Sequence, residues 1–351
     1  MNPPLRLAVV GTLHPHSALF QELLPHVPGI EVVAIVHDGG TIASGMRRLP
    51  AYDRLEDLLS KEVFDAALLT VPNDKGAEAA CALAGAGKHI LADKPVCRSA
   101  KEMYEVVEAV RKANVKFAVA YQRRFHPAHR RARRMARGGG LGALFNVQAH
   151  LITTDIPSRG PGHYLFKKER SGGGILHWLG CHVIDLVRDL AGCEFADVVG
   201  TVGRVSGAPV DVEEVASVAF RLENGAAGSI TVGYAIPFAS DSPYKESPKD
   251  SRIAAWGGRA MVAYEPFGDR IELRRFAPED GAPLVEAHDA YPLPLVPGYE
   301  GWLGRSVVAD FVESVAHDRP PSVTALDNLR VLEVIEAVYG RSELRRREYS
   351  P

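Results

Sequence analysis

Apolar strands alternate with amphipathic helices over the first third of this 351-residue chain, and no other feature of the sequence limits the fold as strongly. Five apolar runs predict buried strands, and three segments between them have helical spacing. The runs are residues 5–11, 30–36, 64–71, 88–93 and 115–121, and the helical segments are 17–24, 74–87 and 99–114. Such a series predicts an α/β fold with a doubly wound parallel sheet, which binds ligands at the carboxyl ends of its strands.

A different pattern extends from Phe145 to Leu273. Apolar and polar residues alternate there, as in strands with one covered face, and Asn224–Gly225 is a hairpin turn signal. We therefore expect an open antiparallel sheet in this part of the chain, interrupted by a helix after the glycines at 172–174. Residues 236–250 are rich in Pro and Ser and predict a loop over a site.

Composition and charge exclude several classes of protein. The net charge is -2, with 46% hydrophobic and 24% charged residues, which is ordinary for a globular protein and gives no global field for nucleic acid or acidic membranes. Seven arginines lie between Arg123 and Arg137, where the pattern favours a solvated helix face over RNA or phosphate binding. The sequence has no apolar run of about 18 residues that would span a membrane.

The cysteines indicate a reducing environment. They form neither a CxxC pair nor a metal-binding spacing, and we expect reduced thiols used for packing. The four are Cys81, Cys97, Cys181 and Cys193. The first strand begins within a few residues of Met1, which leaves no room for a signal peptide. These features predict a cytoplasmic protein with no nucleic acid or membrane partner.

The turn after the first strand is a candidate nucleotide site. A dinucleotide-binding loop carries G-x-G-x-x-G here, because small residues let the backbone approach a pyrophosphate at a helix N-terminus. This chain has Gly11, Thr12 and Leu13, with His16 at the position of the third glycine. The motif alone is therefore as compatible with a plain tight turn as with a cofactor.

Asp38, preceded by His37, follows the second predicted strand. An acidic side chain at this position binds the diol of a ribose, although Asp before Gly-Gly is also ordinary turn chemistry. Asp38 would repel a 2′-phosphate, and residues 36–41 contain no arginine that would receive one. If a dinucleotide binds here, we expect NAD rather than NADP.

The helix expected after the glycines has an unusual polar content. At about 100° per residue, Trp178, His182 and Asp185 fall on one narrow stripe, whereas His177 points about a quarter-turn away. The stripe is either a polar insertion in a core face or one wall of a site.

Five motifs in matching order resemble the glucose–fructose oxidoreductase/inositol dehydrogenase (Gfo/Idh/MocA) family. They are LTVPN at 69–73, GKHILADKPV at 87–96, YQRRFHP at 121–127, GGG and GCHVID within 172–185, and LRVLEVIEAVYGRS at 329–342. The resemblance covers essentially the whole chain. It implies an N-terminal Rossmann domain, a C-terminal α/β domain with a large open antiparallel sheet, and NAD or NADP as cofactor. The implied activity is oxidation or reduction of one carbon of a sugar, cyclitol or related polyol.

The same resemblance assigns site residues. The matched cofactor contacts are Thr70, Pro72, Asn73, Asp93, Lys94 and Gln122. Lys94 matches the lysine of the family's Glu-Lys-Pro motif, which orients substrate hydroxyls beside the nicotinamide and helps proton transfer, and Arg123 lies near the nicotinamide and substrate. His182 matches the proposed general acid/base, and Asp185 matches the acid one turn later. His163 and Tyr164, on an expected rim loop, are further candidate substrate contacts.

Three departures from the family pattern stand out. The glycine motif is degraded, and the histidine often found three residues after the asparagine of the Pro-Asn loop is replaced by Gly76. The helix usually has an aspartate four residues before its histidine, whereas this chain has Trp178. We interpret Trp178 as a stacking wall for a sugar ring, with plain core packing as the alternative.

Alcohol oxidation gives Lys94 and His182 complementary roles. A neutral histidine is suited to accept the hydroxyl proton near neutral pH, and a lysine stabilises the developing alkoxide. A surface lysine and a satisfied core histidine are the alternatives. The altered helix also fits an NAD-using glycosidase or lyase that oxidises, eliminates and re-reduces its substrate. A regulator that binds NAD or sugar without chemistry is the third possibility.

These patterns divide the chain into three expected parts. Residues 1–122 form the dinucleotide-binding domain, residues 123–304 the domain for substrate binding and oligomerisation, and residues 305–351 a helical segment that packs back on the assembly. An open sheet with an apolar outer face needs a cover, and we expect residues 145–151 and 226–235 to supply part of that face. The sequence therefore predicts a homodimer or homotetramer.

Overall fold

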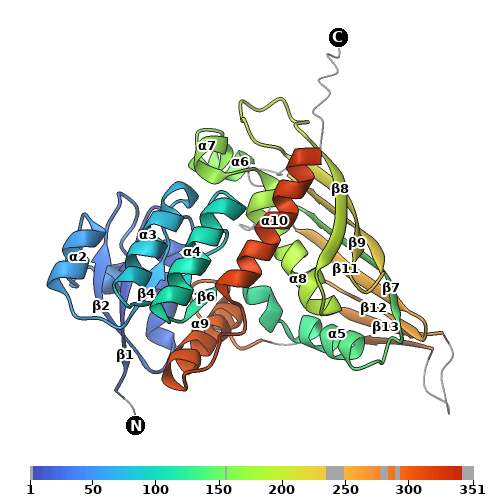
Figure 1. Cartoon of the computed structure of the whole chain (residues 1–351), viewed down its shortest axis with the longest axis horizontal. Coiled ribbons are helices and arrows are strands. Elements are labelled where there is room, and N and C mark those ends of the chain that lie inside the picture. Colours follow the sequence, from blue (N-terminus) through green and yellow to red (C-terminus); the bar gives the residue numbers. More distant parts are fainter. Residues whose placement is uncertain are drawn as a thin grey trace. The chain divides into compact units, whose positions relative to one another are not determined.

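The first third of the chain folds into a six-stranded parallel sheet, as the alternation of apolar strands and helices predicts (Figure 1). Its strands are β1 (Leu5–Val10), β2 (Ile30–Val36), β3 (Ala51–Tyr52), β4 (Ala66–Leu69), β5 (His89–Ala92) and β6 (Phe117–Val119). The strand order is β3-β2-β1-β4-β5-β6, and every neighbouring pair is parallel. β4 is buried along its whole length, which explains its continuous apolar sequence. The short β3 escaped prediction.

Helices connect these strands. They are α1 (Ser17–Leu23), α2 (Leu55–Lys61), α3 (Asn73–Gly85) and α4 (Ala100–Ala113), with short 3₁₀ turns at Leu24–His26, Ser44–Met46 and Gln122–Phe125. α4 shows why the sequence defines its ends so clearly. The side chain of Ser99 accepts a hydrogen bond from the backbone N–H of Glu102, and Asn114 ends the helix in the left-handed conformation. The doubly wound sheet is confirmed.

An eight-stranded sheet forms from the later part of the chain, in the order β14-β13-β12-β11-β7-β10-β9-β8. The strands are β7 (Leu144–Ile152), β8 (Phe195–Gly203), β9 (Val215–Leu222), β10 (Ala227–Gly233), β11 (Asp250–Gly257), β12 (Ala260–Tyr264), β13 (Ile271–Arg275) and β14 (Val285–His288). The pair β7–β10 is parallel and all others are antiparallel. The expectation of a purely antiparallel sheet therefore needs correction. Helices lie between β7 and the next strand, and hairpin signals do not reveal which strand β7 pairs with.

The remaining helices are α5 (Pro127–Arg137), α6 (Ile156–Arg159), α7 (Lys168–Ser171), α8 (Cys181–Ala191), α9 (Gly301–Ala316) and α10 (Ala325–Arg341), with a 3₁₀ turn at Tyr164–Phe166 and a π-helical segment at Leu176–Gly180. The structure, a computed structural model, describes residues 3–154, 156–234, 249–268, 270–276, 284–288 and 293–341. The loop expected at 236–250 lies outside the described residues except for its last two. Among the described residues, no helix is long and apolar enough to cross a membrane.

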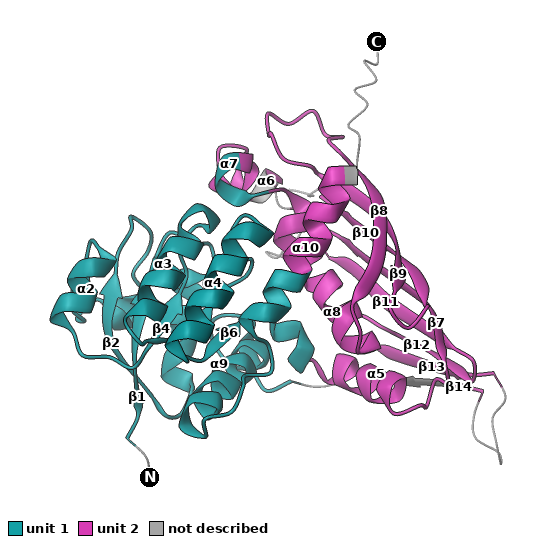
Figure 2. Ribbon diagram, in the orientation of Figure 1, with its two compact units in different colours: residues 1–125, 169–172, 292–330 teal, residues 126–168, 173–291, 331–351 magenta. Residues whose placement is uncertain are grey.

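The chain forms two compact units (Figure 2). Unit 1 contains the described residues of 1–125, 169–172 and 292–330, and holds the parallel sheet. Unit 2 contains those of 126–168, 173–291 and 331–351, and holds the eight-stranded sheet.

Helices α5 and α8 cover one face of the sheet in unit 2 (Figure 1). The opposite face differs from expectation. On β7 the buried Val147 alternates with the exposed Gln148, and on β10 the buried Ile230 alternates with the exposed Ser229 and Thr231. The outward residues in the middle of these two strands are thus polar or small rather than apolar. The apolar part of this face lies on β11 and β12, and it comprises Ala254, Met261 and Ala263 with Trp256 packed against them.

The arginine-rich segment is only partly the solvated helix face that was predicted. Four of its seven arginines form ion pairs with carboxylates. These pairs are Arg123–Glu300, Arg124–Asp327, Arg133–Asp189 and Arg137–Asp189. The sequence does not reveal these partners, because all three carboxylates lie far from the segment along the chain. These four arginines therefore have ion-pair partners within their own units.

Candidate functional site

The loop after β1 is closed by its single glycine. Gly11 has φ +95°, and a Cβ atom there would lie 2.5 Å from the carbonyl oxygen of Thr70. The Thr70 hydroxyl in turn donates to the carbonyl oxygen of Gly11 at 2.7 Å. The carboxyl ends of β1 and β4 are thereby held together, and no other residue type fits at position 11.

Asp38, at the carboxyl end of β2, holds the rest of this loop. Its Oδ1 accepts hydrogen bonds from the backbone N–H groups of Thr12 at 2.6 Å and Leu13 at 2.8 Å, and from the Thr12 hydroxyl at 2.9 Å. His37 Nε2 lies 3.1 Å from the carbonyl oxygen of Gly40. The structure thus brings the predicted residues of β1 and β2 together. It gives two backbone donors of the phosphate loop a carboxylate partner that the sequence did not suggest.

Two buried amide oxygens lie at the carboxyl ends of the strands in unit 1. Pro72 is the N-cap of α3, and the next residue, Asn73, donates from Nδ2 to the carbonyl oxygen of Ser171 at 2.8 Å. Within the described part of the chain, Oδ1 of Asn73 and Oε1 of Gln122 have no hydrogen-bond partner, although both residues are 1% exposed. A buried acceptor without a donor costs about 1–3 kcal/mol. Each of these two oxygens is therefore available to accept a hydrogen bond from a bound molecule.

Asp93 follows β5 and contacts two histidines of the β1 loop. Its Oδ2 lies 3.0 Å from Nδ1 of His14 and 2.7 Å from Nδ1 of His16, while Oδ1 accepts from the backbone N–H of Lys94 at 2.8 Å. Burial lowers the pKa of His16 to about 4 against the opposing effect of Asp93, so His16 is neutral at pH 7. Burial also acts to raise the pKa of Asp93, but the two histidines outweigh it and hold this pKa well below its usual range. Asp93 is therefore ionised.

Lys94 is 1% exposed and precedes Pro95 through a cis peptide bond. Its position after β5 agrees with the predicted location at the carboxyl end of a strand. A Cβ atom at Gly76 of α3 would lie 1.7 Å from the carbonyl oxygen of Val96. The backbone at 96 thus occupies the space that a histidine side chain at position 76 would need. This close approach explains one of the three departures from the family pattern.

Arg123 is 7% exposed, and its guanidinium forms an ion pair with Glu300. Arg123, a predicted substrate contact, therefore has an ion-pair partner within unit 1. Glu300 precedes α9 and has φ 49°. Nothing in the sequence near position 123 indicated that partner.

The helix that carries Trp178 and His182 begins with a π-helical segment. Because residues 176–180 are π-helical, the α-helical spacing used to align Trp178 with His182 does not hold across that segment. Trp178, His182 and Asp185 are 2%, 2% and 0% exposed. His177, expected to point away, is also buried. Burial therefore does not single out one stripe of this helix, and the common face of Trp178, His182 and Asp185 stays a prediction.

Each of these side chains has a described neighbour within unit 2. The guanidinium of Arg159 lies 5.8 Å from the centre of the Trp178 ring. The His182 ring lies edge-on to Phe267, with centroids 6.1 Å apart. Asp185 Oδ1 lies 3.8 Å from a guanidinium nitrogen of Arg188. Asp185 is thus placed as a buried ion-pair partner one turn after His182.

Glu213 occupies the N-terminus of this helix. Its carboxylate accepts from the backbone N–H groups of Gly174 at 2.8 Å and Leu176 at 3.0 Å, and from the Tyr339 hydroxyl at 2.7 Å. A carboxylate of the protein therefore already uses these two backbone donors at the N-terminus of the helix. Burial raises the pKa of Glu213 against its hydrogen bonds.

The two candidates on the expected rim loop, His163 and Tyr164, lie at a 3₁₀ turn. Nδ1 of His163 accepts from the backbone N–H of Leu165 at 3.3 Å and so caps the 3₁₀ turn Tyr164–Phe166. Tyr164 lies within that turn and is 6% exposed. The capped turn buries the tyrosine, and the role of His163 and Tyr164 as substrate contacts stays a prediction.

Sequence reasoning missed His14 and Glu213. A signal for His14 was present, since His14 and His16 are two residues apart directly after the first strand. Glu213 has no local signal, because its partners lie some forty residues before it and more than a hundred after it.

Comparison with known proteins matches both units. Residues 5–121 match the oxidoreductase family with an NAD-binding Rossmann fold, and residues 129–262 match the GFO/IDH/MocA C-terminal domain. The chain is 32% identical over 185 residues to levoglucosan dehydrogenase of Pseudarthrobacter phenanthrenivorans, covering 46% of this chain and 47% of that protein. It is 24% identical over 298 residues to D-xylose 1-dehydrogenase (NADP(+)) 2 of Haloferax volcanii, covering 84% and 82%.

The same fold occurs in solved structures. A levoglucosan dehydrogenase in complex with NADH and levoglucosan has a TM-score of 0.83 with this chain at 20% identity, and the match covers 97% of each chain. The two sheets described above thus belong to a known fold.

Proposed function

Because the chain belongs to the GFO/IDH/MocA family of oxidoreductases, we propose that it transfers hydride between a nicotinamide cofactor and a secondary alcohol of a sugar, cyclitol or glycoside. The observation that carries this proposal is the burial of Lys94, 1% exposed, at the carboxyl end of β5. An ammonium held at the carboxyl end of a strand is suited to stabilise the negative charge that an alcohol develops as it becomes an alkoxide.

Unit 1 supplies the cofactor contacts in this proposal. The buried acceptors of Asn73 and Gln122 suit the carboxamide, and the loop of Gly11, Thr12 and Leu13 borders the phosphates. Thr70 and Pro72 fix the ends of β4 and α3 around them. The cofactor, when bound, accepts the hydride that leaves the substrate carbon.

The proton leaves by a separate path. Lys94 lowers the pKa of the substrate hydroxyl by stabilising the alkoxide, and His182 accepts the proton. Asp185, one turn after His182 on the same helix and next to Arg188, is a positioning or structural group rather than a base. We assign Arg123 and Trp178 to substrate binding, with His163 and Tyr164 as further candidate substrate contacts.

NAD is the preferred cofactor in this proposal. Asp38 is exposed at the carboxyl end of β2, where its charge repels a 2′-phosphate. The name of the xylose dehydrogenase relative includes NADP, so the preference is a property to measure for this chain.

A redox-neutral reaction on glycosides is a second candidate. It is favoured by Trp178, which stands where the family usually has an aspartate four residues before the histidine. Such a reaction would leave the redox state of a bound cofactor unchanged after each turnover. Trp178→Asp should then abolish glycoside cleavage, whereas in a simple dehydrogenase it should preserve or improve NADH formation.

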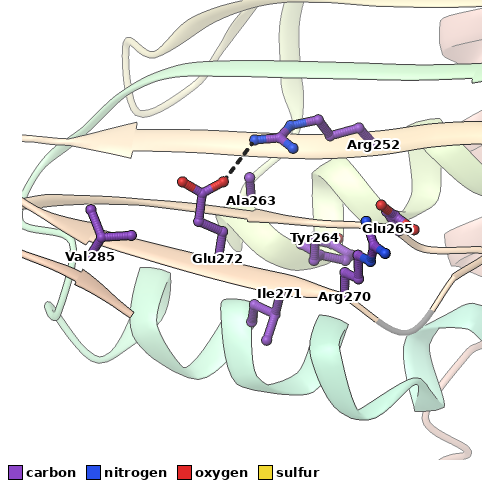
Figure 3. Close-up of a pocket in the computed structure, with 8 residues that line it drawn as sticks. All are labelled: Arg252, Ala263, Tyr264, Glu265, Arg270, Ile271, Glu272 and Val285. Atoms are coloured by element: carbon purple, nitrogen blue, oxygen red, sulfur yellow. Dashed lines mark hydrogen bonds and ion pairs between the residues drawn. The ribbon is translucent and has the colours of Figure 1, made fainter. Parts of the chain in front are cut away.

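The assembly and location of the protein belong to the same proposal. We expect a homodimer or homotetramer formed through the outer face of the sheet in unit 2. Beside its apolar part, a hollow of about 230 Å³ contains the ion pair of Arg252 with Glu272 at 3.3 Å (Figure 3). The four free cysteines suit the cytoplasm. The domain boundaries after residues 122 and 304 stay a prediction.

A substrate screen tests the proposed function. Sugars, cyclitols and glycosides are incubated with the purified chain and either NAD or NADP, and NADH or NADPH is followed by its absorbance. We expect NADH formation with at least one polyol. Nucleotide binding without any reduction or substrate turnover across the screen would contradict the proposal and favour a regulator that binds without chemistry.

A further inference from the structure

Three ligand-type side chains converge at the carboxyl ends of β1 and β5. His14 and His16 lie in the loop after β1, and Asp93 follows β5. One nitrogen of each histidine and one oxygen of Asp93 all lie within 4.8 Å of one another. Both Nδ1 atoms point to the same oxygen, Oδ2 of Asp93, at 3.0 and 2.7 Å.

The surrounding residues hold this cluster of His14, His16 and Asp93 in place. The second carboxylate oxygen of Asp93 is occupied by the backbone N–H of Lys94, so Oδ2 faces the imidazoles. The His16 ring packs against Tyr299, with ring centres 4.9 Å apart. The side chains of His14 and Asp93 are each 2% exposed and that of His16 is 18% exposed. Ligand atoms fixed by neighbouring groups are characteristic of preorganised metal sites.

We propose that His14, His16 and Asp93 bind a divalent transition-metal ion. A small rotation of the three side chains is enough to admit the ion, because metal ligands at about 2.1 Å from Zn²⁺ are about 3.0–3.4 Å apart. Two imidazole nitrogens and one carboxylate oxygen suit Zn²⁺, Co²⁺, Fe²⁺ or Mn²⁺ better than Mg²⁺ or Ca²⁺, which prefer oxygen. Three protein ligands leave a position for water or for an oxygen of a bound molecule.

The proposed metal site lies in the loop whose glycine motif is degraded. The chain has lost two glycines of the phosphate loop and has histidines at positions 14 and 16 of the same loop. The backbone donors of Thr12 and Leu13 bind Asp38 instead. A cation bound by His14, His16 and Asp93 would place positive charge next to this loop. Metal binding itself is independent of the proposed oxidoreductase function, since it needs neither nucleotide nor sugar.

Metal titration of the full chain tests the proposal. The protein is stripped with a chelator and titrated with Zn²⁺ by calorimetry, and the Co²⁺ form is examined by absorption spectroscopy. We expect one Zn²⁺ per chain, and a Co²⁺ spectrum without thiolate charge-transfer bands, which excludes the cysteines as ligands. Zn²⁺ should also raise the melting temperature of the wild-type chain.

His16→Gln and Asp93→Asn should each weaken Zn²⁺ binding by about 10²-fold or more, because loss of a second-shell partner alone costs about 10- to 100-fold. The control is His317→Gln, which removes an exposed histidine paired with Glu313 at 3.0 Å and should bind Zn²⁺ as the wild type does. Circular dichroism verifies the fold of each variant. Wild-type protein that binds no Zn²⁺, or folded variants that bind it unchanged, would overturn the proposal and leave a hydrogen-bonded His-Asp-His cluster.

Discussion

Two sets of buried polar groups, one in each unit, differ in how completely the chain satisfies them. In unit 2, Asp189 contacts His129 Nε2 at 2.8 Å and two arginines, and Glu213 accepts from two backbone N–H groups and a tyrosine. In unit 1, the amide oxygens of Asn73 and Gln122 have no partner among the described residues, and two histidines share one oxygen of Asp93. Complete satisfaction indicates a structural role, whereas remaining binding capacity indicates a ligand.

The largest expected effect is the loss of stability when Asp189 in unit 2 is replaced. Asp189→Ala should lower the free energy of unfolding by about 3 kcal/mol, because it leaves the fully buried His129 and two arginines without their carboxylate. Urea denaturation measures the loss. Asp197→Ala, at an exposed position of β8, is the control and should change stability little. A loss no larger than that of the control would mean that Asp189 is not a structural centre.

The next largest effect is on the turnover rate when Lys94 in unit 1 is replaced. Lys94→Ala should reduce kcat by about 10²-fold, equivalent to about 2.7 kcal/mol, and leave NAD binding nearly intact, since the ammonium acts mainly in the transition state. Steady-state kinetics and calorimetry measure the two quantities. Lys88 precedes the same strand at its other end and donates to the carbonyl oxygen of Phe64 at 2.7 Å, so Lys88→Ala is a matched control. Equal kcat values in both variants would reject the role of Lys94.

A smaller effect concerns cofactor choice. Asp38→Asn keeps an oxygen that accepts from Thr12 and Leu13 but removes the negative charge, and should reduce the preference for NAD over NADP by about 10-fold. The ratio of the two dissociation constants, measured by calorimetry, gives the result. If the wild type binds NADPH more tightly than NADH, the assignment of Asp38 is wrong.

The smallest effect is the pH dependence of unit 2. Burial raises the pKa of Glu213 in the folded state, so the folded chain retains a proton that the unfolded chain releases first. The contribution of Glu213 to stability is therefore fully present below the usual glutamate pKa and is lost as the pH rises through the raised one. Thermal unfolding of the wild type and of Glu213→Gln across this range should show a steeper fall with pH in the wild type. Parallel curves would be inconsistent with a raised pKa.

The sequence was informative where structure is local. The parallel strands, the helix ends at Ser99 and Asn114 and the turn at Asn224–Gly225 follow from periodicity and turn chemistry within a few residues. The π-helical segment, the parallel pair β7–β10 and the ion pairs of the arginines could not be predicted, because each depends on partners distant in sequence. In the candidate site, Asp38 and Asp93 fell at the predicted strand ends, but Glu213 and the contacts of His14 appear only in three dimensions.

A single-turnover experiment tests most directly whether the binding capacity of unit 1 serves hydride transfer. The chain is first saturated with NAD and is then mixed, in excess, with a sugar that binds. The absorbance of NADH is followed together with the amount of product. We expect the amount of NADH formed to equal the amount of sugar converted. In Lys94→Ala the rise in absorbance should be about 10²-fold slower. A bound sugar that is converted, or left unchanged, with no NADH formed at any time would contradict the proposed function.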